Sequence, residues 1–347
     1  MEFNPQCIAT AIGSYPHQST EAACDLILKT TPEIPFWPQL PNLDFRELMD
    51  FQYCEGIPRV VLNTEEKTMH IDTSGDFSSE FEAFYENYLA ENLDYFKISP
   101  EFSRGLYKME EMLLKADRSA MKYFKTQITG PVTFGLSTKD ENKKDIYYNE
   151  VFRDVVVKGI TMKARWMLDR FKALGCDQIC FVDEPVLSAI GSSTYIGVQR
   201  NEMVACMSEV IEALHKDGAL IGTHCCGNTD WTILIDAGVD IINFDAYEYG
   251  ETIALYPDQV KGFLEKGGVL SFGIVPTSDK ILSETPESLV KKLNQCMDNL
   301  ALKGISRSLI FDRCLLTPSC GTGSLAVDVA EKVMNDLAEV SRILRSS

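Results

Sequence analysis

The stretch LIGTHCCGNTDW ends an apolar run on one histidine and two cysteines. If the run is a strand, residues two apart share a face, so His224 and Cys226 are predicted to point together and Cys225 away from them. Cys320, near the end of a later apolar run, offers a second thiol. Imidazole nitrogen and thiolate sulfur are the ligands that Zn²⁺ prefers in a tetrahedral site. We therefore expect His224, Cys226 and Cys320 to bind zinc.

These three residues leave a fourth ligand position open. Asp245 ends the apolar run that follows the histidine, and its carboxylate is the nearest candidate oxygen ligand. The alternative interpretation needs no metal, because free cysteines are often core residues. In that case His224 would hydrogen-bond a backbone carbonyl.

Short apolar runs alternate with helical patterns along the whole chain, and no internal repeat or low-complexity linker interrupts them. This alternation is typical of parallel βα units. The predicted strands are 7–15, 124–134, 177–185, 219–227, 240–247, 269–276 and 314–321, with a weaker eighth strand near RVVLN at 59–63. Eight such units predict an α/β fold of the (β/α)8 TIM barrel type, with a doubly wound sheet as the alternative.

The helical spacing of apolar residues predicts helices at 152–174, 200–217, 286–303 and 323–344. We expect residues 1–347 to form a single barrel domain. The segment 31–122 contains the loop TPEIPFWPQLPN and two acidic helical stretches. Because it is too long for a simple βα connection, we expect it to be a cap or insertion at one end of the barrel.

The composition argues against some classes of partner. The formal net charge of −18 disfavours nucleic acid and anionic membranes, because neither surface attracts an acidic protein. The start MEFNPQCIATAIG lacks the basic and apolar regions of a signal peptide, and no apolar run approaches a membrane span. We expect a reduced, cytoplasmic protein whose cysteines in apolar contexts are core residues, namely Cys176, Cys180 and Cys206.

In a barrel, the carboxyl ends of all strands face one side, where the following loops build the active site. Many polar residues fall at or just after these predicted ends: Gly13, Ser14, Asp183, Glu184, His224, Cys226, Asp245 and Cys320. The predicted fold would therefore bring side chains that are far apart in the sequence into one site.

Five short stretches occur in a single order: TAIGSYP at 10–16, TGPVTF at 129–134, VDEPVL at 182–187, HCC at 224–226 and TPSCG at 317–321. Together they resemble the catalytic half of cobalamin-independent methionine synthase, a zinc barrel related to the uroporphyrinogen decarboxylase-like methyltransferases. The resemblance covers most of the chain outside 31–122. It implies zinc ligation by His224, Cys226 and Cys320. The family's fourth ligand, a glutamate, aligns with Asp245, whose stem is one methylene shorter.

The resemblance implies that the substrate thiol is homocysteine. Backbone groups and the hydroxyl at Ile12, Gly13 and Ser14 match the segment that holds its carboxylate. Asp183 matches the acid that binds its ammonium group, and Glu184 is the other candidate. From the residues alone, a strand-end turn would also explain Gly13 and Ser14, and helix capping would also explain the acidic pair.

The family's methyl donor is a methylated folate, but features that serve folate are absent here. Ser137 stands at the position of the tryptophan that stacks on folate, and Ala189 at that of an acidic residue after the Asp-Glu-Pro motif. No histidine lies near SFGIVP, where the family has the one that protonates the departing amine. A methyl-cobalt bond needs no such proton. We therefore expect methylcobalamin or another methylcorrinoid as the donor, carried by a separate corrinoid protein.

Three alternative functions remain from the sequence. The nearest is a methylcobamide:thiol methyltransferase that acts on coenzyme M or another thiol within a demethylation pathway. A porphyrinogen-type decarboxylase is less favoured, because it needs basic groups for many substrate carboxylates. A non-enzymatic zinc-storage or sensing protein would leave the motifs AIGSYP and VDEP unexplained.

Overall fold

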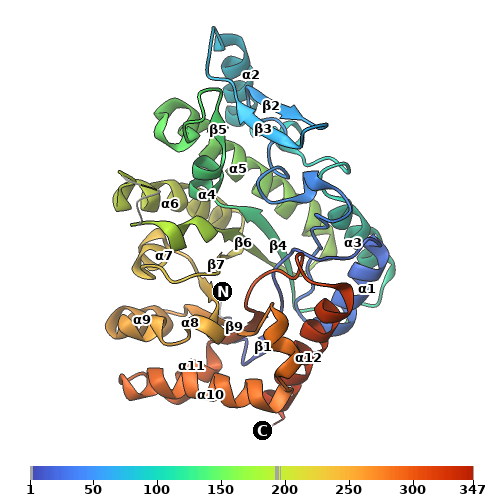
Figure 1. Ribbon diagram of the computed structural model, residues 1–347, viewed down its shortest axis with the longest axis vertical. Coiled ribbons are helices and arrows are strands. Elements are labelled where there is room, and N and C mark those ends of the chain that lie inside the picture. Colours follow the sequence, from blue (N-terminus) through green and yellow to red (C-terminus); the bar gives the residue numbers. More distant parts are fainter. Residues whose placement is uncertain (1–2, 192–194, 196, 347) are drawn as a thin grey trace.

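The computed structural model describes residues 3–191, 195 and 197–346, which form an α/β fold around one main sheet (Figure 1). Within these residues the sheet has seven strands, and each neighbouring pair is parallel. Their order is β1 (Ile8–Ala9), β10 (Cys314–Pro318), β9 (Val269–Val275), β8 (Ile241–Phe244), β7 (Leu220–Cys225), β6 (Asp177–Asp183) and β4 (Tyr123–Thr129). The sheet is curled, as the right-handed twist of strands favours.

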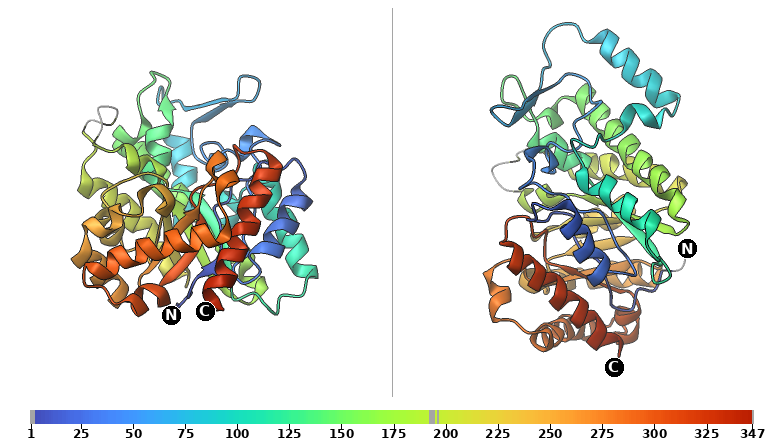
Figure 2. Two further views of the ribbon diagram at one scale, coloured as in Figure 1. Left: turned by 60° about the horizontal axis from the view of Figure 1, so that its bottom comes forward. Right: turned by 90° about the vertical axis from the view of Figure 1, so that its right-hand side faces the viewer.

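Helices cover the outer side of this sheet. The chain begins and ends on the side of the sheet where its strands start (Figure 2). The longer helices are α1 (Thr20–Thr30), α3 (Arg104–Lys115), α5 (Glu150–Phe171), α6 (Arg200–Lys216), α9 (Pro257–Glu265), α10 (Pro286–Leu302) and α12 (Val327–Arg345). The shorter ones are α4 (Pro131–Ser137), α7 (Thr232–Ala237), α8 (Ala246–Tyr249) and α11 (Arg307–Asp312). The four predicted helices correspond to α5, α6, α10 and α12.

The sequence of α10 shows why these helices form where they do. Thr285 caps its first turn in a reciprocal capping box with Ser288, and Pro286 occupies the first helical position, where its missing N–H costs nothing. Leu289, Leu293 and further apolar residues at helical spacing are buried against the core. An amphipathic stripe therefore fixes which face of α10 packs on the sheet.

Strand alternation separates the core into two layers. In β6, Cys180 and Val182 belong to the outer apolar cluster beneath the helices. Ile179 and Phe181 belong to a smaller inner cluster on the concave side of the sheet. Towards the carboxyl ends of the strands, this inner side becomes polar although it stays buried, with Lys125, Gln127, Asn243, Ser271 and Thr317.

The predicted eighth strand at 59–63 was wrongly assigned to the main sheet. It forms β2 (Val60–Asn63), which pairs antiparallel with β3 (Thr68–Ile71), and β3 pairs with β5 (Lys139–Asp140) in a separate sheet. The side chains of β2 are partly or fully exposed. Its β-branched residues predict a strand, but they do not determine which sheet the strand joins.

Part of the segment 31–122 projects beyond the main sheet at one end of the molecule. The β2–β3 hairpin and α2 (Ser78–Leu89) lie there, next to β5 and α5 (Figure 1). Another part, residues 34–40, lies along the edges of the main sheet, since Gln39 bridges Ser14 and Phe36 bridges Lys125. The assignment of 31–122 as a cap or insertion stays a prediction.

A polypeptide helix needs a long apolar stretch to cross a lipid bilayer. Among the described residues, none of the helices has one.

Candidate metal centre

Three of the predicted ligands come together on the concave side of the sheet. A nitrogen of His224 and the sulfur atoms of Cys226 and Cys320 lie within 4.8 Å of one another. His224 belongs to β7, Cys226 follows β7 directly, and Cys320 follows β10. Because β8 and β9 lie between those strands, the curl of the sheet brings Cys320 back to the other two. This group could hold a metal ion.

His224 is oriented by Asn243 of β8. The Oδ1 atom of Asn243 faces Nδ1 of His224, and its Nδ2 donates to the carbonyl oxygen of Ser271 at 3.1 Å and to Oγ1 of Thr317 at 2.7 Å. The carbonyl oxygen of Ser271 can only accept a hydrogen bond, so the Asn243 atom that faces it must be the donor Nδ2. The Asn243 atom that faces His224 is then the acceptor Oδ1. Nδ1 of His224 therefore carries the proton. In the neutral ring Nε2 then keeps its lone pair; this atom is buried and has no hydrogen-bond partner among the described residues.

The two thiols of the group influence each other's protonation. The Cys320 thiol donates a hydrogen bond to Cys226, which, with the neighbouring His224 ring, lowers the pKa of Cys226 to about 4. The same contact raises the pKa of Cys320 well above its usual value. The pair therefore holds one thiolate readily and resists a second negative charge. A divalent cation would supply the charge that favours the second deprotonation.

Cys225 points away from the group, which confirms the strand register predicted for β7. It is fully buried in the outer apolar cluster. Its sulfur contacts the carbonyl of Gly227 at 3.6 Å, and burial raises the pKa of its thiol to about 12. Cys225 therefore behaves as a packing residue.

Asp245 lies at the end of β8, but its carboxylate is not part of the ligand group. Its Oδ1 accepts a hydrogen bond from the backbone N–H of Glu248 at 2.9 Å, so that Asp245 caps α8. Burial raises its pKa to about 6. The structure thus assembles three of the four predicted ligands, and zinc ligation by Asp245 stays a prediction.

Asp183 ends β6 on the same inner side, beside His224. Its Oδ1 is buried and has no hydrogen-bond partner within the described chain. Burial raises the pKa of Asp183, while His224 and Lys125 act in the opposite direction. Thr129 lies opposite Asp183 in the register of β4 and β6. Its hydroxyl likewise has no hydrogen-bond partner in the described part of the chain. Buried polar atoms are normally satisfied, so these two atoms suit a polar or cationic group of a ligand.

Glu184 points to the outer side of the sheet, where its carboxylate accepts hydrogen bonds from the first turn of α4. Its carboxylate accepts from the backbone N–H of Val132 at 3.0 Å, and from the N–H and hydroxyl of Thr133 at 2.6 Å each. Burial nevertheless raises its pKa to about 7. An acidic group at a helix N-terminus satisfies unpaired N–H groups and complements the helix dipole. Of the two acids proposed for substrate binding, the structure therefore places only Asp183 beside the ligand group.

Residues 12–14 follow β1 and lie against the loop after β10 that carries Cys320. The carbonyl of Ser14 accepts from the N–H of Thr322 at 2.8 Å. Gly13 is closely packed, because an added Cβ would lie 2.5 Å from Nε2 of Gln127. The segment is thus near the ligand group, while carboxylate binding by Ile12, Gly13 and Ser14 stays a prediction.

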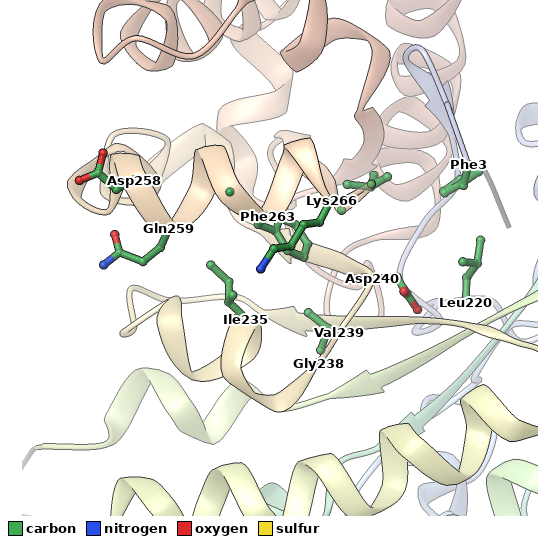
Figure 3. Close-up of a pocket in the computed structure, with 14 residues that line it drawn as sticks. Phe3, Leu220, Ile235, Gly238, Val239, Asp240, Asp258, Gln259, Phe263 and Lys266 are labelled. Carbon is green, nitrogen blue, oxygen red and sulfur yellow. The ribbon is translucent and has the colours of Figure 1, made fainter.

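A pocket of about 510 Å³ opens at the opposite end of the strands (Figure 3). It lies between α9 and the starts of β7, β8 and β9, and Leu220, Asp240 and Lys266 are among its lining residues. Leu220 precedes His224 by four residues, which is roughly 13 Å along a strand. This pocket is therefore separate from the ligand group.

The ligand group suits zinc on chemical grounds. Tetrahedral zinc with bonds of about 2.0 to 2.3 Å needs ligand atoms roughly 3.3 to 3.8 Å apart, and small side-chain rotations would bring atoms within 4.8 Å to that spacing. The imidazole nitrogen Nε2 of His224, which has no hydrogen-bond partner within residues 3–191, 195 and 197–346, and the two adjacent thiols are ligand atoms of the type that zinc prefers.

Sequence reasoning missed the residues that support His224. Asn243, Ser271 and Thr317 are polar, fully buried, and placed on three neighbouring strands. Each interrupts an apolar run at an inward-facing position. Counting in steps of two along each strand would have placed them on the inner side, but only the strand register shows that they meet.

A scan against models of known protein families and a search of curated proteins found no match to this chain.

Proposed function

We propose that this chain is a zinc-dependent methyltransferase that moves a methyl group from a methylcorrinoid to the thiol of homocysteine, giving methionine. The observation that carries the proposal is the ligand group of His224, Cys226 and Cys320 with Asp183 beside it, whose Oδ1 has no hydrogen-bond partner in the described part of the chain. The ligand group suits a metal that activates a thiol. The carboxylate suits a thiol that also bears an ammonium group.

In this proposal each residue has a separate task. His224, Cys226 and Cys320 would hold the zinc, which, when bound, favours the thiolate form of the substrate. Asp183 binds the substrate ammonium group by a charge-assisted hydrogen bond. Residues 12–14 bind the substrate carboxylate through backbone N–H groups and the hydroxyl of Ser14. Such positioning can supply much of the rate enhancement, because two reactants are held in one geometry.

The reaction is balanced by a simple exchange of bonds. The thiol proton leaves to water, the sulfur-carbon bond forms, and the carbon-cobalt bond breaks with its electron pair remaining on cobalt. No oxidant or reductant is consumed. The corrinoid is therefore a second substrate, which a separate corrinoid protein would deliver.

A corrinoid donor is preferred to folate because of residues that the chain lacks. Ser137 offers no aromatic face for a folate ring, and Ala189 offers no acid. The histidines at 17, 70 and 215 lie outside the SFGIVP stretch of β9. A departing folate amine needs a proton donor, whereas reduced cobalt leaves without one.

Coenzyme M is the competing acceptor. Its sulfonate is anionic, so it would be repelled by Asp183 and would leave that carboxylate unpaired. Homocysteine supplies the missing cation, and we therefore prefer an amino-acid thiol.

The test is to mix the zinc-loaded protein with methylcobalamin and homocysteine, coenzyme M or no thiol, and to follow the loss of methyl-cobalt absorbance. We expect the methyl-cobalt absorbance to fall when homocysteine is present, and methionine to form. Efficient methionine formation from methyltetrahydrofolate without a corrinoid would contradict the donor assignment, and activity with coenzyme M alone would contradict the acceptor assignment.

We also propose that the main sheet closes into a (β/α)8 barrel, with residues 34–40 in the eighth position. The bridges of this segment to both edges of the sheet support closure. The N–H of Gln39 donates to Gly13 at 2.7 Å, and that of Lys125 donates to Pro35 at 2.9 Å. Hydrogen exchange should therefore find these two amides as protected as those of β8.

A further inference from the structure

The pocket at the starts of β7, β8 and β9 has the size and the walls of a small-molecule site. Its volume of about 510 Å³ falls within the range of about 300 to 1,000 Å³ that is usual for ligand pockets. Leu220, Val239, Phe263 and Val269 line it with apolar, almost completely buried side chains. Ile235 points into it from α7, opposite α9 (Figure 3). The proposed methyl transfer gives this pocket no task, because the ligand group lies at the other end of the strands.

One face of α9 forms the roof of the pocket, and Gly262 lies at its centre. The lining residues at 258, 259, 262, 263 and 266 follow helical spacing, so they share that face. Glycine inside a helix is less favourable than alanine. A Cβ added at Gly262 would meet no atom within 4 Å, so close packing does not require the glycine. A larger side chain there would enter the pocket.

The other glycines of the pocket have reasons of their own. Gly238 and Gly267 have positive φ angles of 90° and 102°, which favour glycine. A Cβ on Gly268 would lie 2.5 Å from Cε2 of Phe263. Gly262 is therefore the position at which the missing side chain does nothing except leave the pocket open.

Lys266 supplies a positive charge that the described residues do not neutralise. Its side chain is exposed and runs beside Phe263, with the amine directed towards Ile235 across the pocket (Figure 3). The ammonium group has no hydrogen-bond or ion-pair partner in the described part of the chain. A ligand in the pocket can therefore place an anionic group on this amine.

The two acidic residues of the pocket are already engaged. Oδ2 of Asp240 accepts from the backbone N–H of Ile221 at 2.7 Å and lies 2.8 Å from Nε2 of His215. Asp258 lies in the first turn of α9, where a negative charge complements the helix dipole. It precedes Lys266 by eight residues, which is roughly 12 Å along a helix. These acids leave Lys266 free for a ligand, and they would repel a second negative charge.

We propose that this pocket binds an amphipathic monocarboxylate. Its apolar part lies under Gly262, against Phe263 and Ile235, and its carboxylate pairs with Lys266. The apolar walls provide most of the affinity, because an ion pair that is open to water contributes little. The charge of Lys266 makes the site prefer an anion to a neutral or cationic molecule of the same shape. This site is independent of the proposed methyl transfer.

The experiment titrates the full-length protein with 4-phenylbutanoate, 4-phenylbutan-1-ol and 4-phenylbutan-1-amine, which share one apolar body and differ in charge. Ligand-observed NMR measures the dissociation constants. The carboxylate should bind about three- to fivefold more tightly than the alcohol, as one exposed ion pair allows, and the amine should bind most weakly. Lys266→Gln should remove the difference between carboxylate and alcohol. Gly262→Leu should weaken both by about tenfold or more, because it excludes apolar groups of the ligand from the pocket.

Lys261 and the melting temperature provide the controls. Lys261 is an exposed lysine of α9 outside the pocket lining, so Lys261→Gln should leave all three affinities unchanged. Gly262→Leu should not lower the melting temperature, because leucine has the higher helix propensity. Lost binding in that variant is then due to the filled pocket and not to unfolding.

Several results would overturn the proposal. Equal affinity of the wild-type protein for carboxylate and alcohol, or tightest binding of the amine, would refute the preference for an anion. A preference that survives in Lys266→Gln would refute the role of that amine. Carboxylate binding that is unchanged in Gly262→Leu would place the ligand elsewhere. Absence of carboxylate binding at millimolar concentration would refute the site itself, without bearing on the proposed methyl transfer.

Discussion

Asn243 accepts a hydrogen bond from Nδ1 of His224 and thereby leaves Nε2 of that ring available to a metal. The amide has no freedom to turn, because its Nδ2 is held by Ser271 and Thr317 on the next two strands. A polar row across β7, β8, β9 and β10 thus sets the tautomer of one side chain.

Asn243→Ala should weaken zinc binding by about 10- to 100-fold, the usual effect of losing a group that orients a metal ligand. Competition with a chromogenic chelator measures the affinity, and ¹⁵N NMR of the metal-free protein should show a mixture of His224 tautomers in place of the Nδ1–H form. Asn294→Ala on α10 is the control, since Asn294 bonds Arg307 away from the ligand group. Unchanged zinc affinity in Asn243→Ala would show that the ring is oriented by other contacts.

Cys225 and Cys226 form a natural pair for testing the register of β7. Cys226→Ala should lose most of the zinc that the wild-type protein is expected to carry, about one ion per chain. Cys225→Ala should keep the zinc and instead lose about 1 kcal/mol of unfolding free energy, because it leaves a small cavity in the outer cluster. Metal analysis and denaturant titration distinguish the two. The reverse pattern would mean that the strand is shifted by one residue.

Thr129 and Thr133 are both buried near the carboxyl end of β4, but among the described residues only the hydroxyl of Thr133 has a hydrogen-bond partner. Thr133→Val removes a 2.6 Å hydrogen bond to Glu184, so it should cost about 1.5 to 3 kcal/mol of unfolding free energy. Thr129→Val removes no bond within the described chain and should be neutral or slightly stabilising. Both should keep their zinc. If Thr133→Val instead weakens homocysteine binding at unchanged stability, Glu184 is a substrate ligand after all.

His215 should make the stability depend on pH. Its Nε2 lies 2.8 Å from the carboxylate of Asp240, and that hydrogen bond raises the pKa of His215 above 6.5. The folded state therefore binds the proton more tightly than the unfolded state. The resulting stabilisation is complete below about pH 6.5 and is lost as the pH rises through the folded-state pKa. The difference in unfolding free energy between wild type and His215→Gln should shrink across that window. His70→Gln in β3 is the control, and a difference that stays constant with pH would contradict the pairing.

The strands of the main sheet could be predicted because both of their faces are buried. Runs such as VLSFGIV of β9 are apolar almost throughout, and Gly or Pro breaks mark many of their ends. The hairpin strand at 59–63 carries a similar local signal. This strand joins a separate sheet because it pairs with Thr68–Ile71, and the β-propensity of its own residues does not determine that pairing.

The site could be predicted in part, and for a similar reason. His224 lies in β7 and Cys226 follows that strand directly, so strand periodicity continued by one residue predicts that the two side chains share a face. Asn243 gave no signal, since a single polar residue in an apolar run is compatible with an exposed edge as well as with a buried network. Its role depends on the register between strands.

The position of the three ligands along the chain has a practical consequence. The connection between α10 and α11, around Gly304, separates Cys320 from His224 and Cys226. If the backbone were cut there, neither fragment would hold more than two of the donors. High-affinity zinc binding would then require both fragments to dock, so the metal could serve as a spectroscopic reporter of fragment complementation.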